Sequence, residues 1–347
     1  MSPSSSDPSK PSWKRDSSKP QLSYRNRFSI DDIFNALDST VLRPVMALLL
    51  IPAALYRHSR SHALVPYAFP KSLRDEVHYL LFNRYKWAGW LAVFVLLRTA
   101  HRAATRYVKN NGAWQADKPN WSNEIVVITG GSAGIGRATV ELLSWKHKAR
   151  IAVLDLAEPT YAAPPDGAPK ILYIKTDVTN KEQIAAAAKQ IEEHFGAAPS
   201  IIINNAGIAG GNTILKTDVS VVEKQWRVMH LSHWLMLQQF LPALIAANHG
   251  HVVNVASSAS YMPIPQLGSY AAAKASALSL HDTLHRELRS RYNAPRVRTS
   301  VVCPTRVDTS LGANMVVHST FIKPDLHPVE VGRESHSCTS LTSSPKN

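Results

Sequence analysis

The segment TGGSAGIG, residues 129–136, constrains the fold of this chain more than any other, because it joins an apolar run to a helical pattern. The preceding EIVVIT is typical of a buried strand, and the following GIGRATVELLSWKHK is typical of a helix. Glycines at such a junction let the backbone turn tightly and approach a pyrophosphate, and the helix N-terminus supplies N–H donors. A glycine motif alone is weak evidence, but in this strand–turn–helix context it predicts a dinucleotide site.

Strand and helix patterns alternate after this segment. Further strands are predicted at RIAVLDL, ILYIKTDV, SIIINNAG, HVVNVAS and VRTSVVCP, and further helices at KEQIAAAAKQIEEHFG, around 219–248 and from about 269 to 291. Such alternation is typical of βαβ units, which form a parallel sheet covered on both faces. The predicted class is therefore α/β, with a Rossmann-type doubly wound parallel sheet.

The composition divides the chain into four regions. Residues 1–27 are rich in Ser, Pro and Lys, which predicts a disordered tail, and they lack the apolar core of a secretory signal. A basic, apolar, membrane-associated region is predicted over 28–120, and the dinucleotide-binding Rossmann domain over 121–330. Residues 331–347 form a polar tail.

The basic charge is concentrated ahead of the predicted sheet. The whole chain carries a net charge of +14, and residues 1–120 contain 18 Lys and Arg against 8 Asp and Glu. Two apolar runs, the 16 mostly apolar residues before Arg57 in the segment 41–60 and the run at 87–97, are short for a bilayer, which needs about 20 apolar residues. They fit either amphipathic helices packed on the globular domain or an in-plane or hairpin membrane anchor, and the cations and aromatics around the second run favour the anchor. We expect a membrane surface as partner rather than nucleic acid, at the endoplasmic reticulum or lipid droplet with the catalytic domain facing the cytosol.

Cysteine and histidine spacing gives no support for a metal centre. The two cysteines, Cys303 and Cys338, do not form a disulfide framework, which favours a reducing compartment, and neither has metal-ligand spacing. His230 and His233 in WRVMHLSHW share a helix face, but a metal site needs a third ligand and no suitably spaced cluster is evident. No metal is predicted.

Asp155 is the residue that bears on cofactor choice. It ends the second predicted strand, 19 residues beyond Gly136, where a carboxylate can hydrogen-bond both ribose hydroxyls and would repel a 2′-phosphate. No Lys or Arg directly precedes Gly134. These features favour NAD over NADP, and the remaining alternative is that Asp155 is a simple turn residue.

Four motifs in order make the chain resemble a short-chain dehydrogenase/reductase. They are TGxxxGIG, NNAG at 204–207, YAAAK at 270–274 with Ser257 13 residues before its tyrosine, and PTRVDT at 304–309. The resemblance covers about 123–330. The PTxVxT form is similar to that of retinol dehydrogenase-like and fungal membrane-associated members.

The resemblance implies a set of cofactor-binding residues and a possible homo-oligomer. Asn204 is expected to be more structural than its neighbours. The implied cofactor residues are Gly130, Ser132, Gly134, Ile135, Gly136, Asp155, Asp177, Val178, Asn205, Ala206, Gly207, Tyr270, Lys274, Pro304, Val307 and Thr309.

Ser257, Tyr270 and Lys274 are the predicted catalytic residues. Tyr270 and Lys274 lie one helical turn apart, hence on one face. A free phenol has a pKa near 10, and the Lys274 ammonium together with a positive nicotinamide ring would lower it. Tyr270 would then exchange a proton with the reacting oxygen, held by Ser257, while hydride passes to or from the cofactor.

His230 is the fourth expected member of this centre. The family places an asparagine there that holds a water in the proton path to the lysine, and alignment on FLPALI puts His230 at that position. Three readings stay open: a working substitute, an impaired relay, or a shifted alignment. His233 is expected to pack in the core.

The predicted substrate is a lipophilic alcohol or ketone of retinoid, sterol-like or long-chain type. The mouth of the predicted active site would be apolar, because it contains Tyr261, Met262, Pro263, Ile264 and Pro265. The alternatives are an NADP-dependent carbonyl reductase and a catalytically impaired membrane or lipid-droplet binding protein with the same fold. The polar sequence after FIKPDLHPVEV departs from the helix and strand expected of the family, which predicts a truncated end of the sheet.

Overall fold

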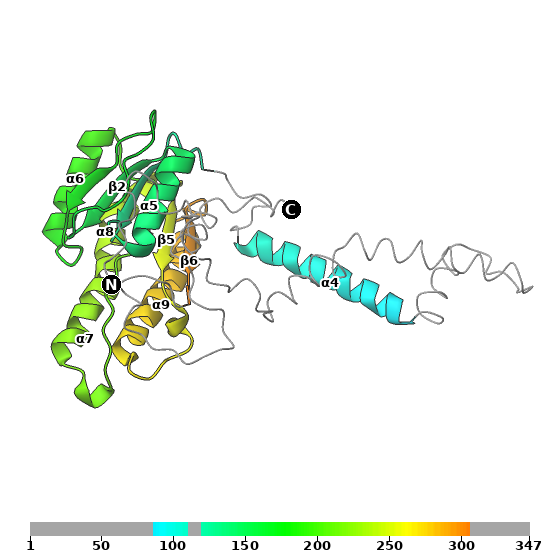
Figure 1. Ribbon diagram of the computed structural model, residues 1–347. Coiled ribbons are helices and arrows are strands. Elements are labelled where there is room, and N and C mark those ends of the chain that lie inside the picture. Colours follow the sequence, from blue (N-terminus) through cyan, green and yellow to red (C-terminus); the bar gives the residue numbers. More distant parts are fainter. Residues whose placement is uncertain (1–85, 110–118, 306–347) are drawn as a thin grey trace, which may run out of the picture. The chain divides into compact units, whose positions relative to one another are not determined.

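The computed structural model of the protein describes residues 86–109 and 119–305 (Figure 1). The helices are α4 (Lys86–Lys109), α5 (Gly134–His147), α6 (Lys181–Phe195), α7 (Val219–Trp226), α8 (Ser232–Ala247) and α9 (Gly268–Ser290). The strands are β1 (Ile125–Thr129), β2 (Arg150–Asp155), β3 (Leu172–Lys175), β4 (Ile201–Asn204), β5 (His251–Val255) and β6 (Arg298–Val302). Short turns of helix lie at η3 (Ile214–Lys216), η4 (Arg227–Leu231) and η5 (Ser258–Ser260).

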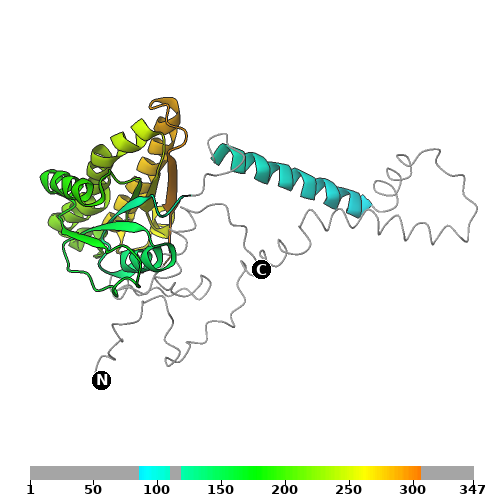
Figure 2. The same cartoon turned by 90° about the horizontal axis from the view of Figure 1, so that it is seen from above.

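The six strands form one sheet in the order β3-β2-β1-β4-β5-β6, and every neighbouring pair is parallel. The predicted doubly wound parallel sheet is therefore confirmed, and Figure 2 shows it from above. The chain starts in the middle at β1, moves outward to β3, and returns to β4 on the other side of β1. Ligands of such sheets bind at this reversal, beyond the carboxyl ends of the strands.

The sheet is buried on both faces, which explains the continuous apolar runs of its strands. On one face Val127, Ile202 and Val252 pack with the apolar side chains of α6, α8 and α9. On the other face Val126 and Ile203 pack with Val140 and Leu143 of α5 and their neighbours. The two cores hold the carboxyl ends of the central strands in fixed register, and the candidate site is built on those ends.

The helix predicted around 219–248 has an internal change of winding. Residues of α7 and α8 are α-helical, but Arg227–Leu231 between them form one π-helical turn. A π turn contains an extra residue and is often found at functional sites. It changes the faces on which the residues of WRVMHLSHW lie.

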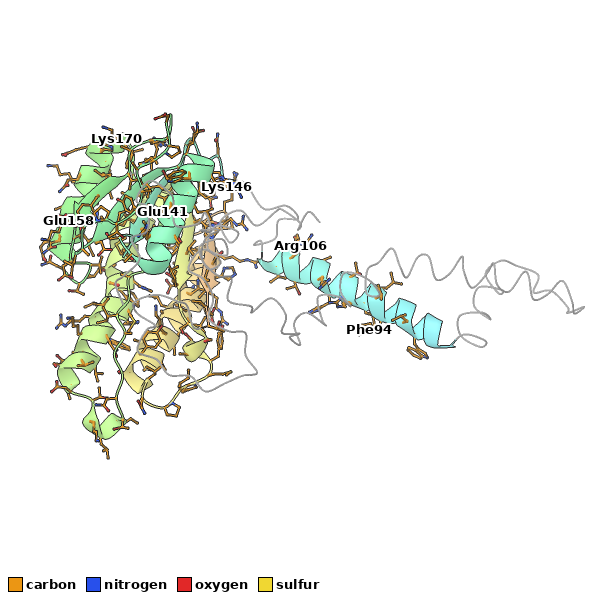
Figure 3. The ribbon with its side chains drawn as sticks, in the orientation of Figure 1. Phe94, Arg106, Glu141, Lys146, Glu158 and Lys170 are labelled. Atoms are coloured by element: carbon orange, nitrogen blue, oxygen red, sulfur yellow. The ribbon has the colours of Figure 1, made fainter. Side chains whose placement is uncertain are left out.

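Helix α4 belongs to a separate compact unit and is described by itself. It is 24 residues long and contains the predicted apolar run at 87–97 in its first half. Exposed apolar side chains include Trp90, Phe94 and Leu97, and Arg102 and Arg106 follow toward its C-terminal end; Figure 3 labels Phe94 and Arg106. Within the described part of the chain, none of the helices combines the length and apolarity needed to cross a bilayer.

Several predictions from the sequence concern residues outside the described ranges. These are the disordered tail at 1–27, the first apolar run at 41–60, the cofactor residues Val307 and Thr309, and the polar tail at 331–347.

Candidate active site

The glycine turn between β1 and α5 has a geometry that only glycine satisfies at key positions. Gly130 and Gly134 have φ angles of 65° and 57°, in the left-handed region. A Cβ atom on Gly136 would lie 2.1 Å from the carbonyl oxygen of Gly130 and 2.6 Å from Nδ2 of Asn205. The backbone is therefore drawn close together at the start of α5, as a pyrophosphate cradle requires.

Thr129 and Asn205 tie this turn to the neighbouring strand end. The Thr129 hydroxyl accepts hydrogen bonds of 3.0 Å from the backbone N–H groups of Asn205 and Ala206. The Asn205 amide donates in return to the carbonyls of Thr129 and Gly130, at 3.0 and 2.8 Å. Thr129 was missed by the sequence prediction, although its place as the last residue of β1 is a usable signal.

Asp155 contacts the glycine turn directly. One carboxylate oxygen accepts from the backbone N–H of Ser132 at 2.9 Å, and the other accepts from that of Ala157 at 3.1 Å. The second bond is a local turn, but the first spans 23 residues of sequence. Asp155 is therefore more than a turn residue: its carboxylate is fixed at the end of β2, beside the turn that would hold the pyrophosphate.

The other predicted cofactor residues lie around the same strand ends. Asp177 caps the turn after β3 by accepting from the N–H and hydroxyl of Thr179, at 2.9 and 2.8 Å. Val178 is buried, and the Pro304 carbonyl accepts from the N–H of Ser258 at 2.9 Å. A Cβ on Gly207 would lie 3.6 Å from Nζ of Lys274. These strand ends fit a dinucleotide that runs from Asp155 toward Lys274.

Ser257 and Tyr270 meet on the β5 side of this edge. Ser257 follows β5 and caps the short turn η5, where its hydroxyl accepts from the N–H of Ala259 at 3.2 Å. Tyr270 lies in the first turn of α9 and is 7% exposed. Burial raises the pKa of the Tyr270 phenol, and the nearby Ser257 hydroxyl opposes that rise by hydrogen bonding.

Lys274 lies one turn beyond Tyr270 in α9, with its ammonium buried. Its Nζ donates to the carbonyl of Val255 at 2.7 Å. Burial lowers the pKa of Lys274 to about 8, which the nearby Cys303 thiol partly opposes. Burial is the largest influence on the pKa of both Tyr270 and Lys274. The predicted lowering of the phenol pKa depends on the positive nicotinamide ring as well as on Lys274, and it stays a prediction.

The structure places Met229, rather than the predicted His230, against the catalytic tyrosine. Met229 is fully buried and packs in one cluster with Tyr270 and Ala273. Its sulfur lies 3.8 Å from the point where a Cβ of Gly207 would stand. The His230 ring stacks on Trp226 instead, with 4.3 Å between ring centroids, and is part-exposed. This geometry agrees with the shifted-alignment reading, and a catalytic role of His230 stays a prediction.

Cys303 is a further residue of the site that the sequence did not assign to it. It lies near Ser257, Tyr261 and Lys274, and burial raises the pKa of its thiol.

Among residues 86–109 and 119–305, no group of three His, Cys, Asp or Glu side chains could hold a metal ion.

Comparison with known proteins agrees with this site. The short chain dehydrogenase family model matches residues 124–318. Dehydrogenase RED2 of Cochliobolus heterostrophus is 40% identical over 186 residues, which cover 54% of this chain and 69% of the relative. Estradiol 17-beta-dehydrogenase 11 of Homo sapiens is 35% identical over 214 residues, covering 60% and 69%. Among solved structures, that of levodione reductase shares the fold with a TM-score of 0.58 at 23% identity, over 63% of this chain and 92% of that one. The chain therefore belongs to the short-chain dehydrogenase/reductase family of NAD(P)-dependent oxidoreductases.

Proposed function

We propose that the protein transfers hydride between NAD(H) and a lipophilic alcohol or ketone at a membrane surface. The observation that carries this proposal is the placement of Ser257, Tyr270 and Lys274 at the same sheet edge as the glycine turn. A proton-exchanging phenol, a hydroxyl that can hold an oxygen, and a buried ammonium suit the oxidation of a secondary alcohol or the reverse reduction.

The chain's own residues would handle the proton and the reacting oxygen. A bound nicotinamide would supply the hydride acceptor or donor. In the oxidative direction the Tyr270 phenolate takes the hydroxyl proton of the substrate, and Ser257 donates a hydrogen bond to the same oxygen. Lys274 stabilises the phenolate by its charge once the cofactor ring adds a second positive charge nearby.

The preference for NAD is supported by Asp155. Its carboxylate is held by two backbone N–H groups beside the glycine turn, at 2.9 and 3.1 Å. A fixed negative charge at that position can accept hydrogen bonds from ribose hydroxyls and repels a 2′-phosphate.

The lipophilic substrate is supported by the segment between Ser257 and Tyr270. Tyr261, Met262 and Ile264 expose apolar surface there, with 64%, 59% and 38% of their area accessible. One relative, estradiol 17-beta-dehydrogenase 11, is named after a steroid alcohol. A further relative, short-chain dehydrogenase/reductase family 16C member 6 of Bos taurus, is 32% identical over 202 residues. We propose a substrate of sterol, retinoid or long-chain type.

Membrane association is supported by α4 and the basic N-terminal region. Trp90, Phe94 and Leu97 are exposed on a helix that carries cations and no acidic residue. Such a helix can lie in the interface of an anionic bilayer, with apolar side chains in the acyl boundary. We propose the cytosolic surface of the endoplasmic reticulum or lipid droplet, with a homo-oligomer as a further possibility.

Met229 favours a second candidate, an oxidoreductase fold kept as a non-catalytic lipid or membrane binding protein. A thioether beside Tyr270 and Lys274 is a poor partner for a proton-conducting water. An NADP-dependent carbonyl reductase is the remaining alternative.

The full chain, purified with detergent, should be assayed with NAD and with NADP against estradiol, all-trans-retinol and a long-chain secondary alcohol. Turnover with NAD that is lost in Tyr270→Phe supports the proposal. Binding of NADH without any turnover in either direction favours the non-catalytic candidate, and turnover with NADP alone favours the carbonyl reductase.

A further inference from the structure

His233 is the least satisfied buried polar side chain near the candidate site. It is 1% exposed, and within the described chain neither of its ring nitrogens has a hydrogen-bond partner. It lies in the first turn of α8, directly after the π turn. Because buried polar atoms almost always have partners, a ring with two orphaned nitrogens points to small polar molecules held around it.

Lys274 lies within electrostatic reach of this ring. Burial lowers the pKa of His233 to about 3, and the positive charges of Lys274 and His230 act in the same direction. The Lys274 ammonium has three donors, and within the described chain the Val255 carbonyl accepts from one of them. The other donors are free to bind the cofactor or a water.

Two asparagines provide further orphaned atoms in the same layer. Asn204 and Asn254 follow the alternation of Ile202 and Val252, so they lie on the sheet face covered by α8 and α9. The Asn204 amide donates to Asn254 at 2.8 Å, but Oδ1 of Asn204 and Nδ2 of Asn254 have no partner in the described chain. Asn254 directly precedes Val255, whose carbonyl accepts from Lys274, so these atoms belong to the strand end that holds the ammonium.

His230 connects this layer with the surface. It lies three residues before His233 and interacts with it electrostatically. Its ring is part-exposed against Trp226, and its Nδ1 is buried without a partner in the described chain. The pair therefore runs from a buried ring to a part-exposed one.

We propose that His233 and His230 hold a proton path between Lys274 and solvent, through water bound to the orphaned atoms, which bypasses the position occupied by Met229. The effect of this path on turnover rests on the proposed function, because it requires that the protein oxidises an alcohol. In the oxidative direction the proton that Tyr270 takes from the alcohol passes by way of Lys274 to water. One nitrogen of the neutral His233 ring then accepts a proton from that water while the N–H bond at the other nitrogen breaks. The released proton passes to His230 and from there to solvent.

The low pKa of His233 agrees with such a role. A ring that stays neutral can accept a proton at one nitrogen only while it releases one from the other, so it conducts without holding a charge. Lys274, with a pKa of about 8, can exchange a proton near neutral pH. Within the described chain, Lys274 and His230 are the titratable groups that interact electrostatically with His233, and Cys303 interacts in turn with Lys274. Both histidines act through Lys274 and are positioning residues.

The kinetic test compares His233→Leu, His230→Phe and His281→Leu in the full chain. His230→Phe keeps a ring to stack on Trp226 but has no nitrogen. His281→Leu is the matched control, because His281 is also a buried histidine with an unpartnered Nδ1 in the described chain, two turns along α9 from Lys274. NADH affinity and the thermal midpoint are measured for all variants.

We expect His233→Leu to lower kcat by about tenfold or more and to increase the solvent deuterium isotope effect. His230→Phe should lower kcat in the same direction, and His281→Leu should leave it unchanged. The thermal midpoint of His233→Leu should not fall, since an apolar side chain replaces a ring with two unpaired nitrogens.

Combining His233→Leu with Met229→Asn distinguishes a role of His233 in proton transfer from a role in packing. An amide at 229 can hold water beside Lys274, so Met229→Asn should restore most of the kcat lost in His233→Leu. A loss that persists unchanged in the Met229→Asn background would show that His233 acts only by packing and would overturn the proposal. An unaltered kcat and isotope effect in His233→Leu would overturn it as well.

A second measurement does not depend on turnover. The full chain, labelled with ¹⁵N-histidine and saturated with NAD, gives the His233 resonances by difference from His233→Leu. A neutral ring with both nitrogens hydrogen-bonded is expected. A ring with a nitrogen that makes no hydrogen bond would overturn the water path even if no substrate is turned over, whereas absence of turnover with a bonded ring counts against the proposed function alone.

Discussion

Nζ of Lys274 donates a 2.7 Å hydrogen bond to the carbonyl of Val255, which ties the first turns of α9 to the end of β5. Val255 lies two residues before Ser257 in the sequence, and Lys274 lies one helical turn after Tyr270. The three predicted catalytic residues are thus linked through a backbone carbonyl rather than by side-chain contacts alone.

Tyr270→Phe should reduce turnover by about 10²–10⁴-fold, because the ring remains but the proton-exchanging hydroxyl is lost. NADH affinity, measured by fluorescence, should remain close to that of the wild type. Turnover that is unaffected by the substitution would refute the assignment of Tyr270.

Asp155→Ala should weaken NAD binding by about tenfold and improve NADP binding relative to NAD. The carboxylate that would accept from ribose hydroxyls is removed, and so is its hydrogen bond to the N–H of Ser132. Titration of both cofactors against wild type and variant measures the change. An NADP preference already present in the wild type would contradict the role given to Asp155.

Gly136→Ala should abolish cofactor binding and lower the free energy of unfolding by on the order of 1–3 kcal/mol, because its Cβ would overlap neighbouring backbone. That atom would lie 2.1 Å from the Gly130 carbonyl oxygen. Gly268→Ala is the matched control, since its nearest neighbour would be Cγ1 of Ile214 at 3.9 Å. Urea unfolding and NADH titration of both variants test the difference, and equal behaviour would contradict the close approach.

The protein should lose stability as the pH falls below about 6.5. Burial lowers the pKa of His233 and His251 to about 3 and that of His281 to about 4, so between those values and 6.5 the unfolded chain binds more protons than the folded one. Each of these histidines can then remove up to about 2 kcal/mol of unfolding free energy between pH 7 and pH 5.

Urea unfolding at pH 7 and pH 5 measures this loss. His233→Leu should show a smaller difference between the two pH values than the wild type, because one buried titrating ring is gone. An equal difference in both proteins would mean that His233 is protonated in the folded state.

Replacing Phe94 and Leu97 of α4 by Asp should reduce co-sedimentation with vesicles of anionic phospholipid. Both side chains are exposed, with 55% and 66% of their area accessible, and a carboxylate cannot enter the acyl boundary. Deletion of residues 1–110 should abolish the binding. Vesicle binding that survives the deletion would place membrane contact in the sheet domain instead.

The sequence was sufficient for the sheet and for the cofactor turn. Continuous apolar strands and the run TGGSAGIG have few alternative folds, because a parallel sheet buries both faces and the turn requires left-handed glycines. The spacing of Tyr270 and Lys274 likewise fixed their common face, since residues four apart on a helix are neighbours.

The sequence alone did not decide which residue of WRVMHLSHW faces the reacting centre. Neighbouring residues of a helix differ in direction by about 100°, so a one-residue error in alignment exchanges the roles of Met229 and His230. The π turn at Arg227–Leu231 adds a further shift that no periodicity reveals. Only tertiary packing, with Met229 beneath Tyr270 and His230 against Trp226, decided the question.

What the sequence by itself determined is therefore the set of local backbone geometries: the strands, the glycine turn and the helical pair of Tyr270 and Lys274. What the tertiary structure decided is which polar atoms meet, as at Thr129 with Asn205 and Asp155 with Ser132, and which stay without a partner in the described chain, as at His233. The physical reason is that backbone preferences act over a few residues, whereas burial and hydrogen bonding depend on segments that lie far apart in the chain.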